Sequence, residues 1–393
     1  MPNLSRRAMS LQESAIRKLD LTVVRHPDVR FHRLNIGQPD VRTPRPILQA
    51  IQGFNPDVIA YGPASGLPAC REAAAAYHGQ LCPKLRAEHV AVTTGGSEGL
   101  LFAFTALCDP GDEILALEPY YTNYNGFATV AGVHIKPVRT HIDDGFAMPS
   151  DEVLDAAITD RTRALVFSNP ANPTGAVYGR DDLMRLLAWA KRHDIFVIAD
   201  EVYRRIWFDE PPASALQFDE YSDYVIIIDS MSKTYSACGL RLGFLISRNA
   251  ELMEKIERLG QARLGPQPLA QVAAIAALHL DETYYDRIRQ TYKGRVHALM
   301  HTLGSIPGVS FPHPSGAFYA MVKLPVESSE RFARFLVTEF RDAGESVVVA
   351  PAPGFYASPT DGTDQVRLAA VLEERLIRRA GEILGAALHA YKD

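Results

Sequence analysis

The sequence contains few cysteines, and they form no recognisable pattern. Four occur in 393 residues, at Cys70, Cys82, Cys108 and Cys238, and none belongs to a CxxC pair or to a metal-ligand spacing. A disulfide framework or a cysteine-based metal site therefore has no support in the sequence. We interpret Cys238 as a small packing residue, and we expect the chain to work in a reducing, cytoplasmic compartment.

Long hydrophobic runs are also lacking. No apolar stretch approaches the ~20 residues that a membrane span requires, and residues 1–20 lack the apolar core of a signal peptide. These first residues have the pattern of a short amphipathic helix, with Leu11, Ile16 and Leu19 on one side. The sequence therefore predicts no membrane partner.

Neither sign of charge dominates the chain. The formal net charge is -5, and the basic residues are scattered, so nothing indicates a nucleic-acid partner. Repeats and low-complexity tracts are lacking as well. With 47% hydrophobic and 22% charged residues, the composition is that of an ordinary globular chain that is long enough for two domains.

What is present is a regular alternation of strand-like and helical segments. Short β-type runs are expected at residues 90–93, 113–117, 133–138, 163–168, 195–199, 224–229 and 242–246. Helical patterns separate most of these runs, and this order favours a mostly parallel sheet with helices on both faces. Sheets of this kind bind ligands at the carboxyl ends of their strands.

A smaller unit of short strands follows towards the C-terminus. Strands are expected at residues 308–311, 318–322, 347–351 and 365–370, before a closing helix at 373–389. Near the N-terminus, prolines at positions 39, 44 and 46 mark a rigid crossing between two parts of the chain. We therefore predict a large domain of residues 45–285 and a small α+β domain formed by residues 1–44 and 286–393.

The most informative stretch is Ser230-Met231-Ser232-Lys233, which follows an apolar run and precedes Arg241. An amine at a strand end can form a Schiff base with a carbonyl compound, and hydroxyls with a guanidinium can hold a phosphate dianion. Pyridoxal 5'-phosphate (PLP) combines both groups, and proteins hold it through a lysine Schiff base. A lysine after a strand is, by itself, more often a solvated surface residue.

Three other stretches supply what this cofactor requires. Asp200 closes an apolar run, where its carboxylate can pair with a protonated pyridine nitrogen or simply cap a helix. Two Asn-Pro pairs at residues 169–173 force a turning path that can aim an Asn into a site, or form an ordinary loop. Gly95 and Gly96 open a helix whose backbone N–H groups can cradle a phosphate, although a GG turn alone is common. All these motifs follow strands, which predicts one shared site.

In this order and spacing, the motifs resemble those of the class I and II aminotransferases, which are PLP enzymes of fold type I. The resemblance extends over residues 35–388. It implies an α/β fold with a mostly parallel, seven-stranded sheet sandwiched by helices, plus a smaller α+β domain. It also implies a homodimer with the site at the subunit interface.

The resemblance also implies a role for individual residues. Lys233 matches the lysine that binds the cofactor and moves protons, Asp200 the partner of the pyridine nitrogen, and Tyr203 a donor to the cofactor's 3-oxygen. The residues implied to surround the cofactor are Gly95, Gly96, Ser97, Tyr121, Asn172, Asp200, Tyr203, Ser230, Ser232, Lys233 and Arg241, with Tyr61 of the partner subunit. Gly37, Asn172 and Arg367 match the substrate-binding positions, with Arg367 holding the α-carboxylate.

The implied activity is transfer of the amino group of an L-amino acid, through PLP and its amine form, to a 2-oxo acid such as 2-oxoglutarate. The runs GQPD, TTGGSE and APAPGFY resemble bacterial aspartate aminotransferases, so aspartate is the first expected donor. One subgroup of those enzymes binds the side-chain carboxylate with a lysine directly after the GG pair, where this chain has Ser97. Arg33 and Arg263 are the remaining basic candidates. The aromatic residues at positions 120, 121, 124 and 355 would also suit tyrosine or a branched amino acid as the donor.

Two other classes of function stay open at this point. The same scaffold supports lyase, cyclase or oxidase chemistry on amino acids, which would release ammonia or form a ring without consuming an oxo acid. Aminotransferase-like domains also occur fused to DNA-binding heads. Only about thirty residues precede the fold here and the chain is acidic, so the sequence argues against such a sensor.

Overall fold

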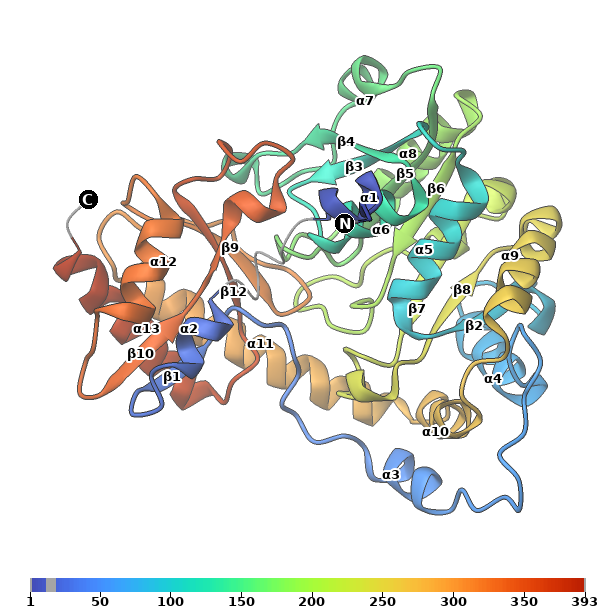
Figure 1. Ribbon diagram of the computed structural model, residues 1–393, viewed down its shortest axis with the longest axis horizontal. Helices are drawn as coiled ribbons and strands as arrows, with labels where there is room; N and C mark the ends of the chain where they lie inside the picture. Colours follow the sequence, from blue (N-terminus) through green and yellow to red (C-terminus); the bar gives the residue numbers. More distant parts are fainter. Residues whose placement is uncertain (1, 12–18, 392–393) are drawn as a thin grey trace.

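The computed structural model describes residues 2–11 and 19–391. Within these residues, the central sheet has seven strands, in the order β2, β8, β7, β6, β5, β3 and β4 (Figure 1). Their bounds are β2 (Val90–Thr93), β3 (Glu113–Glu118), β4 (His134–Arg139), β5 (Thr162–Ser168), β6 (Phe196–Asp200), β7 (Val225–Ser230) and β8 (Gly243–Ile246). Only β8 runs antiparallel to its neighbours in this sheet. The expected mostly parallel sheet is confirmed.

Helices cover both faces of this sheet because its strands are apolar on both sides. Along β7, Ile226 and Ile228 pack on one side and Ile227 on the other. The first side is covered by α5 (Gly95–Leu107), α6 (Asn123–Ala131) and α9 (Ala250–Arg263). The second is covered mainly by α4 (Pro68–Gly79), α8 (Arg180–Arg192) and α10 (Pro268–Leu278). Strands buried on both faces are typical of parallel sheets.

The C-terminal part of the chain forms a smaller group of elements, which lies at the left of Figure 1. It contains α11 (Glu282–Gly304), β9 (Tyr319–Lys323), α12 (Ser329–Thr338), β10 (Glu345–Val348), β11 (Ala350–Pro351), β12 (Gln365–Ala369) and α13 (Glu374–Ala390). Strands β11, β12 and β9 form an antiparallel sheet. Near the N-terminus, β1 (Arg30–Arg33) pairs in parallel with β10, so the first and last parts of the chain meet. The domain boundaries at residues 44 and 285 stay a prediction.

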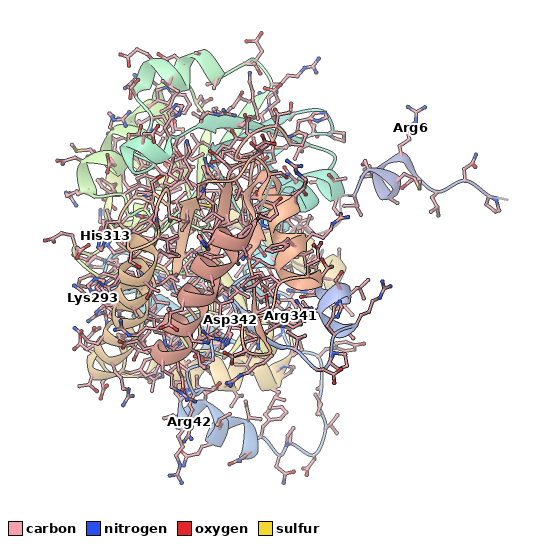
Figure 2. All side chains as sticks on the ribbon, turned by 90° about the vertical axis from the view of Figure 1, so that its left-hand side faces the viewer. Arg6, Arg42, Lys293, His313, Arg341 and Asp342 are labelled. Carbon is pink, nitrogen blue, oxygen red and sulfur yellow. The ribbon has the colours of Figure 1, made fainter. Side chains whose placement is uncertain are left out.

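The remaining elements are short. They are α1 (Arg6–Ser10), α2 (Asp20–Val24), α3 (Arg45–Gln52), α7 (Asp151–Ala157) and the 3-10 helices η1 (Ala87–His89), η2 (Ile142–Asp144), η3 (Ala215–Gln217), η4 (Asp219–Tyr224), η5 (Cys238–Leu240) and η6 (Ala352–Phe355). Figure 2 shows α1, marked by Arg6, projecting from the body of the molecule. The Nη1 atom of Arg7 donates a hydrogen bond of 3.2 Å to the carbonyl of Val130. No helix among the described residues is long and apolar enough to cross a membrane.

Some predicted elements differ from the observed ones. The expected N-terminal amphipathic helix is only partly described, since Ile16 lies outside the described residues. The expected strand at 308–311 is reduced to one bridge between Ser310 and Lys323, because prolines on both sides leave little room for a ladder. Helix α12 was not predicted, although Ser328 caps its N-terminus through a hydrogen bond from the Arg331 N–H.

We expect Gly243→Ala to destabilise the fold. A Cβ at this position would lie 2.6 Å from the Asp229 carbonyl oxygen and 2.7 Å from the carbonyl carbon of Gly95. Either β8 or the start of α5 must then shift, so the free energy of unfolding, measured by urea denaturation, should fall by about 1–3 kcal/mol.

Gly126→Ala is the matched control for this variant. Apart from its chain neighbours and the backbone of its own helix, no atom of the described residues lies within 4 Å of a Cβ built at Gly126, and alanine is the better helix former by about 1 kcal/mol. This control should be at least as stable as the wild type. Equal stability of wild type and Gly243→Ala would contradict the tight packing inferred here.

Candidate active site

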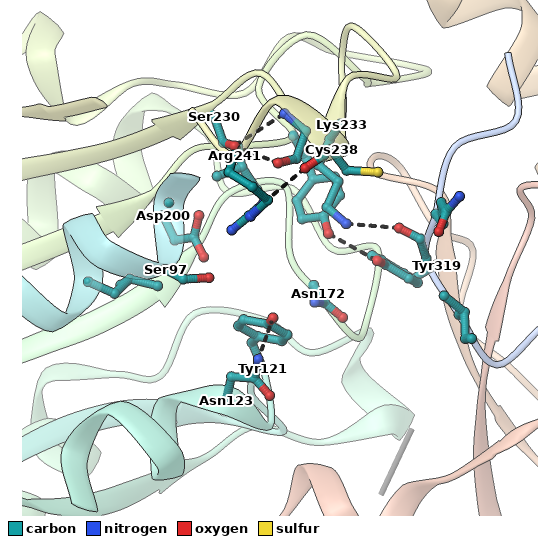
Figure 3. A pocket seen from close by; sticks show the side chains of 18 of the residues that line it. Ser97, Tyr121, Asn123, Asn172, Asp200, Ser230, Lys233, Cys238, Arg241 and Tyr319 are labelled. Carbon is teal, nitrogen blue, oxygen red and sulfur yellow. Dashed lines mark hydrogen bonds between the residues drawn. The ribbon is translucent and has the colours of Figure 1, made fainter. Parts of the chain in front are cut away.

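One cavity of about 690 Å³ lies at the carboxyl ends of the parallel strands. Most of the residues singled out in the sequence line it: Gly37, Gly96, Ser97, Tyr121, Asn172, Asp200, Tyr203, Ser230, Ser232, Lys233, Arg241 and Arg367. Figure 3 shows several of these side chains converging on one space. Most of them follow strands of the central sheet, and they meet because parallel strands all end at the same edge of a sheet. Tyr319 and Arg367 reach the cavity from β9 and β12 instead.

Lys233 follows β7 and presents its amine to the cavity. Its Nζ donates a hydrogen bond of 2.8 Å to the carbonyl oxygen of Gly37, and it lies 5.8 Å from the centre of the Tyr203 ring. The structure gives Lys233 no carboxylate partner within the described residues. The amine is therefore held by one neutral acceptor, which leaves it able to react.

Asp200 is buried at the end of β6. The hydroxyl of Tyr124 donates a hydrogen bond of 3.0 Å to its Oδ2, while its Oδ1 has no hydrogen-bond partner among the described residues. Burial raises the pKa of the Asp200 carboxyl to about 6, although the bond from Tyr124 acts in the opposite direction. A buried carboxylate with one free oxygen suits a cationic N–H donor.

A cup of small and basic groups lies on the side of Arg241. Ser230 Oγ donates to Ser232 Oγ at 2.8 Å, and the Ser232 N–H donates to Ser230 Oγ at 3.1 Å. Gly95 has a φ of 76°, and a Cβ there would lie 2.6 Å from Nη2 of Arg241. Glycine therefore permits both the turn into α5 and the close approach of the guanidinium. Hydroxyls, a guanidinium and the first N–H groups of a helix together suit a phosphate.

Arg367 is only 1% exposed, and it carries an uncompensated positive charge. Its Nη1 donates to Asn172 Oδ1 at 3.2 Å and its Nη2 to the carbonyl of Asn35. The Nε atom has no hydrogen-bond partner within the described residues. Burial lowers the pKa of the guanidinium, and such a group suits a carboxylate ligand, with which a guanidinium forms strong, directed hydrogen bonds.

Four of the candidate residues lie elsewhere or contact the cavity only indirectly. Gly95 supports the cup through Arg241. Tyr61 is 85% exposed and does not line the cavity of its own chain. Arg33 bonds to Asp20 at 3.0 Å, and Arg263 forms an ion pair with Glu98. Neither arginine lines the cavity.

Sequence reasoning missed Asn123 and Tyr319, and it named Tyr124 only as an aromatic neighbour and not as a partner of Asp200. Tyr124 holds Asp200, Asn123 Nδ2 donates to the Tyr121 hydroxyl at 2.8 Å, and the Tyr319 hydroxyl lies 3.0 Å from that of Tyr203. Their positions depend on helix phase and strand register. Tyr319, for example, lies opposite Ala369 on β12, which places it on the same face of the small sheet as Arg367.

Comparison with known proteins now identifies the family. The family model described as "Aminotransferase class I and II" matches residues 30–382. The chain belongs to this family. The aspartate/prephenate aminotransferase of Thermus thermophilus is 30% identical, over 98% of this chain and 100% of the relative. A structure of the Thermus thermophilus aspartate aminotransferase with maleate matches with a TM-score of 0.89 at 29% identity, and it covers 98% of this chain and 100% of that one.

Relatives in this family are named for different substrates. The arginine–pyruvate transaminase of Pseudomonas aeruginosa is 30% identical over 90% of this chain and 91% of its own length. The expected family, fold, enzyme class and cofactor are confirmed: the chain is a PLP-dependent aminotransferase. Its residues fit PLP, because the free Oδ1 of Asp200 faces a cavity that also holds an amine and a phosphate cup.

The raised pKa of Asp200 predicts that the free energy of unfolding of the cofactor-free protein depends on pH. Between the unfolded value of about 4 and the folded value of about 6, the folded state binds more protons than the unfolded chain. Stability conferred by this group is therefore lost as the pH rises. Asp200→Asn has no carboxyl group at this position, so its stability should not show this loss. The difference in unfolding free energy, variant minus wild type, should therefore be about 1–2 kcal/mol larger at pH 8 than at pH 5.

This difference is measured by urea denaturation of both cofactor-free proteins at the two pH values. Burial also raises the pKa of the neighbouring Glu201 to about 7, but that group is present in both proteins and cancels in the difference. A difference that does not change with pH would show that the Asp200 pKa is not raised.

Proposed function

We propose that this aminotransferase moves the amino group of an L-amino acid to a 2-oxo acid such as 2-oxoglutarate, with aspartate as the first donor to test and an aromatic amino acid as the second. The observation that supports this most is the convergence of Lys233, Asp200 and Arg367 on one cavity with a phosphate cup. Each of the three carries or accepts a charge that the reaction requires.

Some cavity residues act on the cofactor and others on the substrate. When bound, PLP supplies an aldehyde that accepts the amino group and a ring that withdraws electrons from the Cα of the substrate. Lys233 Nζ would hold the aldehyde, and the same amine would accept the proton that leaves Cα. Asp200 keeps the ring nitrogen protonated, and Tyr203 with Asn172 donates to the 3-oxygen.

Two further groups of residues would orient the cofactor and the substrate. The phosphate would be held by Ser230, Ser232, Arg241 and the N–H groups at Gly95, Gly96 and Ser97, and Tyr121 would contact the ring. Arg367, with Gly37 and Asn172 beside it, holds the α-carboxylate of the substrate, and this decides which Cα bond is aligned for cleavage.

The choice of donor depends on what meets the substrate side chain. Among the described residues, the cationic groups that line the cavity are Lys233, Arg241 and Arg367, and the proposed mechanism uses all three. Ser97 is neutral, so a second carboxylate requires a neutral donor in this chain or a group from a partner subunit. For this reason an aromatic donor is tested beside aspartate.

We also propose that the active form is a homodimer. Val58 and Ile59 are 74% and 73% exposed, and Tyr61, Leu264 and Leu269 add further exposed apolar surface. The two segments lie together, because Arg263 Nη2 donates to the Ala64 carbonyl at 2.9 Å. A cluster of this kind is typical of an interaction surface. We propose that in this dimer Tyr61 reaches the phosphate cup of the partner subunit, as the resemblance to the family implies.

The half-reaction tests the proposed function directly. PLP-loaded protein is mixed with each amino acid singly, without an oxo acid, while the absorbance of the cofactor and the release of ammonia are followed. We expect stoichiometric conversion of the cofactor to its amine form without ammonia, fastest with the true donor. Ammonia release, or turnover with PLP retained, would instead indicate a lyase or oxidase.

Lys233→Ala is the control for this experiment. It should convert no cofactor, and borohydride reduction should leave no PLP covalently attached, because the amine that binds the aldehyde is gone. Covalent attachment that persists in Lys233→Ala would show that another lysine holds the cofactor.

Val58→Asp tests the dimer. A carboxylate in an apolar interface costs several kcal/mol unless it is paired, so the dimer dissociation constant should rise at least about tenfold, measured by sedimentation velocity. PLP affinity should fall in parallel if Tyr61 acts across the interface. Val153→Asp is the control, because Val153 is an exposed valine on α7. A dimer that is unaffected by Val58→Asp would place the interface elsewhere.

A further inference from the structure

Tyr319 is a buried residue of β9 that lines the cavity and contacts groups from three distant parts of the chain. Its hydroxyl lies 3.0 Å from that of Tyr203, in the part of the chain between β6 and η3. Its ring lies under the guanidinium of Arg367 on β12, at 4.5 Å from the Cζ atom. The third neighbour is Gly37, near the N-terminus.

The hydroxyl of Tyr319 occupies the place where a side chain at Gly37 would be. A Cβ built at Gly37 would overlap this hydroxyl, so the hydroxyl touches the backbone segment whose carbonyl accepts the bond from Lys233. In Figure 3, Tyr319 and Lys233 lie on the same side of the cavity. One hydroxyl therefore contacts both Tyr203 and the segment that holds the reactive amine.

The direction of the bond between the two hydroxyls follows from the proposed role of Tyr203. If Tyr203 donates its proton to the cofactor's 3-oxygen, it can only accept from Tyr319. Hydrogen bonds in a chain polarise one another, so a bond that Tyr203 accepts strengthens the bond that Tyr203 donates. The hydroxyl of Tyr319 would thus strengthen the bond that Tyr203 makes.

The ring of Tyr319 contributes separately. The Arg367 guanidinium lies over this ring and also over that of Phe355, whose centre is 4.9 Å from Cζ. Asn172 holds one edge of the guanidinium, and Nε keeps no partner in the described part of the chain. Two aromatic faces restrict the tilt of the cation, which sets where a carboxylate can bind.

We propose that Tyr319 is a positioning residue of this site, with its hydroxyl acting through Tyr203 and its ring acting through Arg367. This inference rests on the proposed roles of those two residues. Single variants can distinguish these two roles. Loss of the hydroxyl should shift the pH midpoint of the cofactor's absorbance change, and loss of the ring should weaken substrate affinity.

Tyr319→Phe removes the hydroxyl and keeps the ring. In the PLP-loaded protein, the pH midpoint of the visible absorbance change should rise by roughly half a unit to one unit, because the 3-oxygen is less well stabilised. We expect kcat to fall about three- to tenfold, while the KM of the donor stays within about twofold. An unchanged midpoint would overturn the role of the hydroxyl.

Tyr285→Phe is the matched control. Tyr285 is buried outside the cavity, and its hydroxyl lies 2.9 Å from that of Tyr235. The variant therefore removes one hydroxyl from a comparable hydrogen-bonded pair of tyrosines. Midpoint, kcat and KM should all stay at wild-type values. A midpoint shift equal to that of Tyr319→Phe would mean that any buried hydroxyl has this effect, and would overturn the proposal.

Tyr319→Leu removes the ring as well. Relative to Tyr319→Phe, the KM of the donor should rise about 5- to 30-fold, as expected for a desolvated cation–π contact of about 1–2 kcal/mol. Retained PLP and an unchanged thermal midpoint check that the variant folds. A KM equal to that of Tyr319→Phe would overturn the role of the ring.

Arg367→Lys, measured in parallel, separates this inference from the proposed function. If Arg367→Lys raises KM and Tyr319→Leu does not, only the role of Tyr319 is wrong. If neither variant changes KM, the assignment of Arg367 as the carboxylate-binding residue fails first, and the role of the ring fails with it.

Discussion

The organisation of this molecule depends on a topological constraint of parallel sheets. Strands that run the same way must end at the same edge, and helices that return the chain occupy both faces. The residues that follow β2, β3, β5, β6 and β7 are therefore brought together whatever their distance in sequence. Asp200 and Ser230 are the last residues of β6 and β7, so the site lies where the constraint places it.

The cost of this arrangement is two buried charges without an opposite partner within the described residues. Asp200 has one free oxygen and Arg367 one free nitrogen, and burial shifts both pKa values against the charged form. Uncompensated charges are expensive in a protein interior. A cationic ring nitrogen and a carboxylate would offset them, so binding of cofactor and substrate should stabilise the folded state.

The site also joins the two parts of the molecule. Asn172 and Tyr203 belong to segments that follow strands of the central sheet, whereas Arg367 and Tyr319 belong to the small antiparallel sheet. The bonds between Arg367 and Asn172 and between the two tyrosine hydroxyls cross from one part to the other. A change in how the parts pack would therefore alter the substrate and cofactor contacts together.

The sequence by itself predicted the fold class and most of the residues that line the cavity. Lys233, Asp200 and the GG pair stand in short polar motifs directly after apolar runs, and such local patterns are readable without coordinates. Tyr124 and Tyr319 carry no such signal, because their contacts depend on how a helix and a strand are turned towards residues more than 70 positions away. The strand at 308–311 was overestimated, because the prolines on both sides of it leave little room for a ladder, and helix α12 was missed although Ser328 caps its N-terminus. Only the tertiary structure decided that Arg33 and Arg263 pair with nearby carboxylates and stay out of the cavity, because ion pairs form by proximity in space and not by spacing in sequence.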